Sequence, residues 1–107
     1  MEILSNKMQL EDLLNRVGKR TFVEYYDDFK ELTTKNVPNA KVVEKIRDDF
    51  TEKSKNSRTA KAKRIFVEGK QIEALKIIVE STHPSVRPII NQANALLNKE
   101  LNKKKLS

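Results

Sequence analysis

Apolar residues recur every three or four positions along most of the chain, which is the spacing of one face of an α-helix. The first pattern predicts a helix over about 6–17 that ends at Gly18. A second helix should begin at Thr21, whose spacing from Glu24 is that of a capping box. Five large side chains on one narrow face of this helix predict the centre of the core. They are Phe22, Tyr25, Tyr26, Phe29 and Leu32.

The next pattern follows Pro38, which biases Val37 away from helical dihedral angles and so ends the aromatic helix. We expect a third helix over about 40–50, capped by Asn39. The segment TEKSKN, residues 51–56, contains no apolar residue and is typical of a solvated connection.

Two further helices are predicted before the last connection. One spans about 57–68, with Asn56 or Ser57 as its cap and Gly69 as its end. The other spans about 71–82 and is apolar around more than half of its circumference, which predicts a central helix packed on more than one side. The apolar face of the helix over 57–68 consists of Ala62, Ile65 and Phe66.

The last helix is expected to start at a Ser85 cap, with Pro88 tolerated in its first turn. Residues from about 102 to 107 are predicted to form a short basic tail, whose lysines complement the C-terminal end of the helix. The apolar stripe of this helix is Val86, Ile89, Ile90, Ala93, Leu96, Leu97 and Leu101.

Composition agrees with a helical protein. The chain has 107 residues with only two glycines and three prolines, and helix-forming residues are frequent. We therefore predict one compact all-α domain over 1–107, a bundle of five to six short helices. The helices over 40–50 and 57–68 follow each other in the order of a helix-turn-helix, although the polar segment between them exceeds the usual three to four residues.

Several features bear on the compartment. Cysteine is absent, so the chain has no disulfide or thiolate metal site and fits a reducing interior. No apolar run exceeds three residues, far below the roughly 20 needed to span a bilayer. Glu2 stands where a signal peptide would carry positive charge. We expect a cytoplasmic protein without a membrane span.

Charge is divided unevenly along the chain. The formal net charge is +7, but residues 1–52 hold nine basic and eleven acidic side chains, a net charge of −2. Residues 53–107 hold thirteen basic and four acidic side chains, a net charge of +9. Clustered positive charge attracts polyanions and accelerates their encounter, so this asymmetry favours a polyanionic partner.

The positive half begins with a dense basic stretch, SRTAKAKR, residues 57–64. A rotation of about 100° per residue would turn its charges away from the apolar face of the helix. The small side chain of Ala60 would leave a gap where a phosphate chain can approach. The same lysines would equally cover a solvated helix face. The predicted nucleic-acid-binding residues are Lys53, Lys55, Arg58, Lys61, Lys63 and Arg64.

The sequence shows no residue pattern typical of a catalytic or metal site. The only histidine, His83, precedes Pro84 in a connection, and the sequence supplies neither a nucleophile nor an orienting acid for it. The acidic faces of the second and third helices also lack the Glu-x-x-His spacing of bundle metal sites, so we expect them to be solvated. We predict no catalytic residue, no metal and no cofactor. The acidic residues are Glu24, Asp27, Asp28, Glu31, Glu44 and Asp48.

These features predict a small, non-catalytic nucleic-acid-binding or regulatory protein that contacts mainly phosphates, with DNA as the expected polyanion. The basic helix over about 57–68 and the loop before it would make the contacts. The alternative is a protein–protein interaction module, such as an adaptor, an inhibitor or an assembly subunit, that uses the acidic faces of the second and third helices or the C-terminal helix, or that self-associates as a homodimer. The lysine- and asparagine-rich composition is typical of accessory genes from phages or mobile elements of low-GC bacteria.

Overall fold

The computed structural model describes residues 2–47 and 49–106, with side chains described at 9–47 and 49–103. Within this part the protein is all-α without a strand, so the predicted fold class is confirmed. Seven α-helices and one 3₁₀ helix are present, slightly more elements than the predicted five to six. They are α1 (Glu2–Val17), α2 (Lys19–Glu24), α3 (Tyr26–Thr34), α4 (Asn39–Lys45), α5 (Glu52–Val67), α6 (Gln71–Val79), η1 (Pro84–Ile89) and α7 (Ile90–Leu106).

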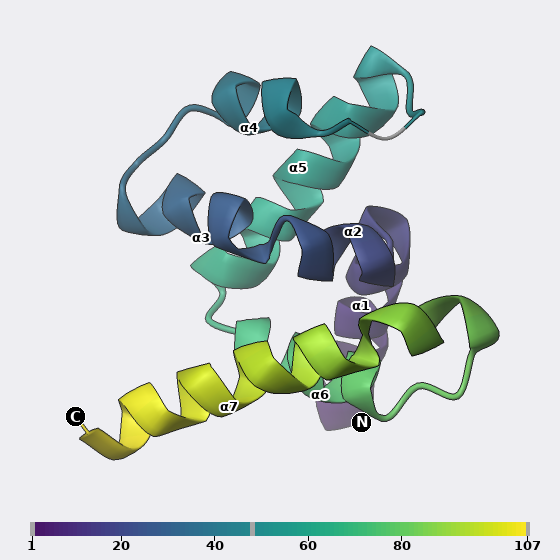
Figure 1. Ribbon diagram of the computed structural model, residues 1–107, viewed down its shortest axis with the longest axis vertical. Coiled ribbons are helices and arrows are strands. Elements are labelled where there is room, and N and C mark those ends of the chain that lie inside the picture. Colours follow the sequence, from purple (N-terminus) through teal and green to yellow (C-terminus); the bar gives the residue numbers. More distant parts are fainter. Residues whose placement is uncertain (1, 48, 107) are drawn as a thin grey trace.

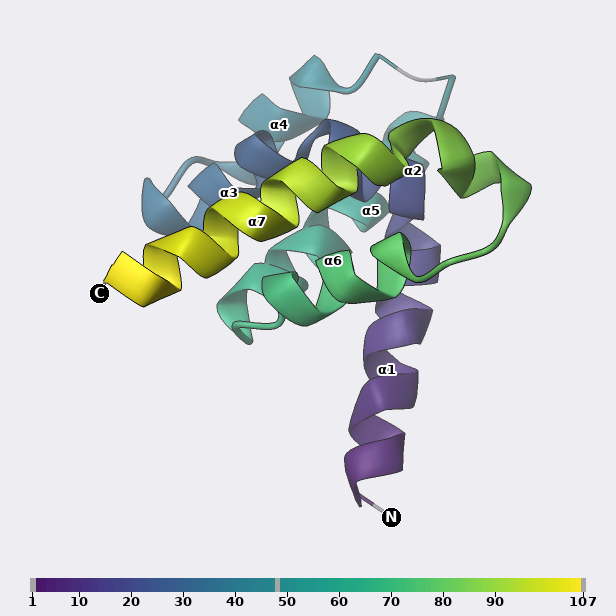
Figure 2. The same ribbon diagram turned by 60° about the horizontal axis from the view of Figure 1, so that its bottom comes forward.

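Helix α5 passes through the middle of the molecule in Figure 1 and packs against α1, α3 and α4. Helices α6 and α7 pack against each other at the opposite end from α4, and Figure 2 shows the N-terminal part of α1 projecting beyond them. The helix predicted over 71–82 corresponds to α6, which does pack on more than one neighbour. The central position, however, belongs to the more polar α5.

The predicted aromatic stripe does form the centre of the core. Phe22 and Phe29 are fully buried, and Tyr26 is 2% exposed. The ring of Phe66, from α5, lies 5.7 Å from that of Phe22 and 5.1 Å from that of Tyr26. The Phe22 and Tyr26 rings meet edge to face at 5.5 Å, a favoured arrangement of aromatic quadrupoles. This cluster fastens α2 and α3 to the inner face of α5.

The predicted single aromatic helix is in fact two helices, and its predicted capping box is wrong. Gly18 takes a φ of +93°, which turns the chain so that α2 begins at Lys19. Thr21 therefore lies buried inside α2, and Glu24 pairs with Arg20 instead. Tyr25, with φ −110° and ψ 24°, interrupts the helix before α3.

The central helix begins earlier than its apolar pattern indicates. Thr51 is the N-cap of α5, and its hydroxyl oxygen accepts a hydrogen bond from the backbone N–H of Ser54 at 3.1 Å. The segment predicted as a connection is thus the first turns of α5, and neither Asn56 nor Ser57 is a cap. The preceding helix, α4, ends at Lys45, five residues before its predicted end.

The connection between α4 and α5 is the stretch of residues 46–51. It is longer than the turn of three to four residues usual for a helix-turn-helix. Helix α4 itself begins at Asn39, with Pro38 rather than Asn39 at the N-cap position. The helix-turn-helix resemblance stays a prediction.

Gly69 ends α5 as predicted. Its φ is +69°. The Gly69 N–H donates to the carbonyl oxygen of Phe66 at 3.0 Å, and the Lys70 N–H donates to the carbonyl oxygen of Ile65 at 2.9 Å. These two bonds make a Schellman motif, which satisfies carbonyl groups that the helix end leaves free. Helix α6 follows and ends at Val79, three residues before its predicted end.

The last helical segment starts differently from the prediction. His83, not Ser85, is the cap, because its Nδ1 accepts a hydrogen bond from the Ser85 backbone N–H at 3.2 Å. Pro84 takes the first position of η1, where a missing N–H costs nothing. At the other end, the residues predicted as a basic tail are helical as far as Leu106.

A buried polar network attaches α7 to α3. The Tyr26 hydroxyl donates to Glu100 Oε2 at 2.6 Å, and the Lys30 ammonium pairs with Oε1 at 2.9 Å. Burial alone would raise the pKa of the Glu100 carboxyl, but these two bonds outweigh burial and lower it. Burial and the bond to Glu100 both raise the pKa of Tyr26. Glu100 is therefore a buried carboxylate whose charge is satisfied by α3.

Among the described residues, no helix is both long enough and apolar enough to cross a bilayer.

Candidate nucleic-acid interface

The outer face of α5 is a continuous strip of basic and small side chains. It contains Lys53, Ser57, Ala60 and Arg64, all exposed. Lys61 and Lys63 flank this row on either side and are half-buried. No acidic residue occurs between positions 53 and 67. We call this strip the α5 basic face.

The arrangement follows from the helical rotation of about 100° per residue. The inner face of α5 consists of Thr59, Ala62, Ile65 and Phe66, all buried. Positions on the opposite side then point to solvent, so the prediction that Ala60 is exposed among the charges is confirmed. Because Ser57 and Ala60 are small, a phosphate chain lying on this face would meet little steric obstruction.

Two of the basic side chains are held by neighbours on α5. The Lys61 ammonium donates to Ser57 Oγ at 2.6 Å, and the Arg64 guanidinium pairs with the Glu68 carboxylate at 2.8 Å. The hydrogen bond from Arg64 lowers the pKa of Glu68 although slight burial opposes it. Both interactions join residues four apart on an exposed surface, where such pairs are weak. Phosphate oxygens can therefore replace these partners at small cost.

Arg58 does not point outward as the sequence suggested. Its side chain is half-buried, and its Nη1 donates to the Val17 carbonyl oxygen at 2.6 Å. Its Nε donates to Ser54 Oγ at 3.0 Å, and the centre of the guanidinium lies 3.7 Å from the centroid of the Phe50 ring. The prediction placed Arg58 on the wrong side, because Arg58 precedes the buried Ala62 by four positions and the buried Ile65 by seven and so lies toward the inner face of α5, against α1. Arg58 holds α1, α5 and the loop before α5 together.

The two lysines predicted in a loop are helical. Lys53 and Lys55 lie in the first turns of α5, and Lys53 is exposed on the α5 basic face. Lys55 is half-buried, because it precedes the buried Thr59 by four positions and so lies over the inner face. Of the six predicted residues, Lys53, Lys61, Lys63 and Arg64 share the α5 basic face.

The acidic side chains of α2 and α3 are largely paired within the chain. Glu24 pairs with Arg20, Glu31 with Lys35, and Asp28 with Lys45 of α4, the last at 3.0 Å. The bond to Asp28 raises the pKa of Lys45. In the described part of the chain, no three carboxylate or imidazole groups converge as metal ligands. Asp48, which the sequence placed beside Glu44, lies outside the described residues.

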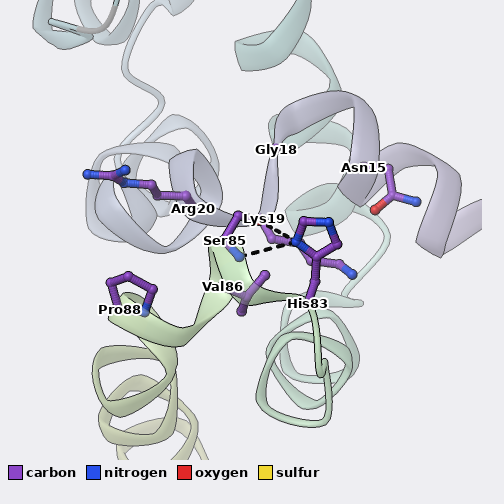
Figure 3. A pocket seen from close by; sticks show the side chains of 8 residues that line it. All are labelled: Asn15, Gly18, Lys19, Arg20, His83, Ser85, Val86 and Pro88. Atoms are coloured by element: carbon purple, nitrogen blue, oxygen red, sulfur yellow. Dashed lines mark hydrogen bonds between the residues drawn. The ribbon is translucent and has the colours of Figure 1, made fainter.

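A groove of about 460 Å³ opens beside His83, where the junction of α1 and α2 meets the connection from α6 to η1 (Figure 3). Lys19, Ser85 and Asn15 contribute polar groups to it, and Val86 contributes apolar surface. A second groove of about 420 Å³ shares Lys19 and His83 with the first. We call the two the first and second His83 grooves.

Within the first groove, Ser85 Oγ lies 2.7 Å from His83 Nδ1, the same atom that accepts the Ser85 backbone N–H. Because Nδ1 accepts the Ser85 backbone N–H, the neutral ring carries its proton on Nε2. From the sequence, His83 was predicted only to be a turn residue. The basic pair Lys19 and Arg20 directly after Gly18 was the sequence feature that could have indicated this groove, but nothing local places that pair beside His83, some 60 positions away in the chain.

Comparison with models of protein families, with curated proteins and with solved structures gave no match.

Proposed function

We propose that the protein is a non-catalytic binder of duplex nucleic acid and that the α5 basic face contacts the phosphates. The observation that carries the proposal is the stretch from Lys53 to Val67, which presents four basic side chains, two exposed and two half-buried, along the outer side of α5 without one carboxylate among them. A basic helix face of this kind supplies the electrostatic, sequence-independent part of nucleic-acid binding.

A duplex fits better than a single strand because single-strand binding relies on aromatic side chains that stack on bases. The two tyrosines and four phenylalanines all fall among the described residues, and each is buried or half-buried. Only Tyr25 and Phe50 are half-buried rather than buried, and the ring of Phe50 is covered by the guanidinium of Arg58. Binding would then depend on phosphate contacts, which a duplex offers at regular spacing.

The polyanion hypothesis is also favoured over the protein-interaction alternative. One form of that alternative uses acidic faces that are free to meet a basic partner. Asp28, Glu24 and Glu31 instead pair with cations of this chain, which lowers the net negative charge of those faces. The excess positive charge is on α5, where the shape also admits a polyanion.

Fluorescence anisotropy with a labelled DNA duplex, a single strand and an RNA duplex over a salt series tests the proposal. The double variant Lys61→Glu with Arg64→Glu should weaken duplex binding at least about tenfold, because each reversal replaces a phosphate contact by repulsion. Circular dichroism should show unchanged helical content, since both side chains lie at the surface.

The matched control is Lys41→Glu with Lys76→Glu, which changes the net charge equally but lies on exposed positions of α4 and α6. It should weaken duplex binding much less than the α5 double variant. Equal losses in the two double variants would mean that net charge alone attracts DNA and would refute an α5 interface. Tighter binding of the single strand than of the duplex would refute duplex preference.

A further inference from the structure

The two His83 grooves differ in charge although they share two residues. No carboxylate lines the first groove, whereas Glu11 and Glu80 line the second. Lys19 and His83 stand between them and belong to both. A ligand that reaches from one groove to the other would therefore meet hydrogen-bond donors at one end and carboxylate acceptors at the other.

The donors of the first groove suit a phosphate group. In Figure 3 the Lys19 side chain runs beside the His83 ring, and Ser85 and Asn15 lie on either side of them. Lys19 supplies a positive charge, and the Nε2–H of His83 is a donor because Nδ1 is occupied by Ser85. Arg20 lines the same groove, but its guanidinium points away from His83 in Figure 3 and pairs with Glu24 at 2.6 Å. Lys19 is thus the cation that faces the groove.

The second groove suits hydroxyl groups. A carboxylate repels phosphate but accepts hydrogen bonds from the hydroxyls of a sugar. Glu11 comes from α1 and Glu80 from the end of α6, so the two acceptors approach from different elements. Neither carboxylate forms an ion pair with another described side chain.

We propose that the His83 grooves bind a phosphorylated sugar, free or as part of a mononucleotide. The phosphate lies in the first groove on Lys19 and His83, and the sugar hydroxyls reach Glu11 and Glu80 in the second. Each groove has a volume within the usual range for small-molecule sites, roughly 300–1,000 Å³. This small-molecule site shares no residue with the α5 basic face, so it is a function beyond the proposed binding of nucleic acid.

Isothermal titration with ribose 5-phosphate, adenosine 5′-monophosphate, inorganic phosphate and ribose tests the proposal. Ribose 5-phosphate should bind more tightly than either inorganic phosphate or ribose, because only it engages both grooves. Comparison with adenosine 5′-monophosphate distinguishes a free sugar phosphate from a nucleotide as the preferred form. Equal binding of inorganic phosphate and ribose 5-phosphate, or no saturable binding at millimolar concentration, would overturn the proposal.

Variants locate the site. Lys19→Ala should weaken ribose 5-phosphate binding about tenfold or more, whereas Lys41→Ala, on an exposed position of α4, should not change it. His83→Asn keeps a side-chain acceptor that can cap η1 but removes the Nε2–H donor, so binding should fall while helical content is retained. Unchanged affinity in both Lys19→Ala and His83→Asn would refute the assignment.

Glu11→Gln with Glu80→Gln tests the second groove by itself. This variant should reduce the preference for ribose 5-phosphate over inorganic phosphate, since phosphate alone does not reach these carboxylates. A preference that is unchanged would refute the sugar subsite. The Lys61→Glu and Arg64→Glu variant should retain ribose 5-phosphate binding, which separates this site from the α5 basic face.

Discussion

The guanidinium of Arg58 hydrogen-bonds the C-terminal end of a neighbouring helix, with its Nη1 2.6 Å from the carbonyl oxygen of Val17, the last residue of α1. The last carbonyls of a helix have no partner within it, and a cation suits the negative end of the helix dipole. The contact joins residues 41 positions apart. It separates Arg58, which stabilises the fold, from Lys61 and Arg64, which remain available at the surface.

Arg58→Ala should lower the free energy of unfolding by about 2 to 3 kcal/mol, because it removes charged hydrogen bonds and the contact with Phe50. Urea denaturation measures this loss. Arg58→Lys should recover only part of it, since an ammonium cannot bond Val17 and Ser54 in the same planar geometry. Duplex affinity of Arg58→Ala should fall less than that of Lys61→Ala, and the reverse order would contradict the structural role.

Gly18→Ala should be more destabilising than Gly69→Ala. Both glycines have positive φ, at +93° and +69°, a conformation that residues with a Cβ rarely adopt. At Gly18 the new Cβ would also lie 2.8 Å from Arg58 Nη1, whereas at Gly69 it meets nothing within 4 Å. In an Arg58→Ala background the difference between the two substitutions should therefore become smaller. A thermodynamic cycle by urea denaturation measures this coupling.

Thr59→Val should stabilise the protein by about 1 kcal/mol. Thr59 is fully buried, and its Oγ1 has no hydrogen-bond partner, so an isosteric methyl group removes a desolvation penalty. Thr51→Val is the matched control, because the same substitution on the same helix removes the N-cap acceptor of Ser54 and should destabilise by about 1 kcal/mol. The melting temperatures of the two variants should therefore shift in opposite directions. A lower melting temperature for Thr59→Val would contradict the inference that the Thr59 hydroxyl is buried without a hydrogen-bond partner.

Stability should decrease in acid because of Glu100. The pKa of Glu100 in the folded protein lies below the ordinary value of 4.5. The stabilisation that Glu100 gives the folded state is therefore complete above about pH 4.5, and it is lost as the pH falls through the pKa of the folded state. Glu100→Gln should destabilise by about 1 to 3 kcal/mol at pH 7, since it removes the charge that Tyr26 and Lys30 satisfy. Urea denaturation between pH 3 and pH 7 should show a smaller pH dependence for Glu100→Gln than for the parent.

Duplex affinity should fall with salt in proportion to the number of phosphates contacted. Four contacts, from Lys53, Lys61, Lys63 and Arg64, correspond to a slope of about −3 to −4 in log affinity against log salt concentration. Each substitution to Ala on the α5 basic face should make the slope shallower by about 0.9. Lys55→Ala should change it less, because Lys55 lies over the inner face of α5 and not on the α5 basic face. A slope that no single substitution alters would argue against discrete contacts.

The sequence alone determined the helical class and most of the core. Apolar spacing depends only on the helical repeat, so Phe22, Phe29 and Phe66 could be assigned to the interior without knowing any neighbour. Helix ends marked by Gly18 and Gly69 were also predictable, because positive φ is a local property of glycine. The start of α5 was missed, since a helix whose first turns face solvent shows no apolar pattern there.

For the candidate sites, the sequence determined which residues of α5 face away from its apolar side. Lys53 and Arg64 are exposed there, and Lys61 lies half-buried at the edge. Only the tertiary structure decided the partners of Arg58, the pairing of Tyr26 with Glu100 over 74 positions, and the grooves around His83. The physical reason is the range of each effect. Helical rotation acts over a few residues, whereas the partner of a long polar side chain is set by which helices pack side by side.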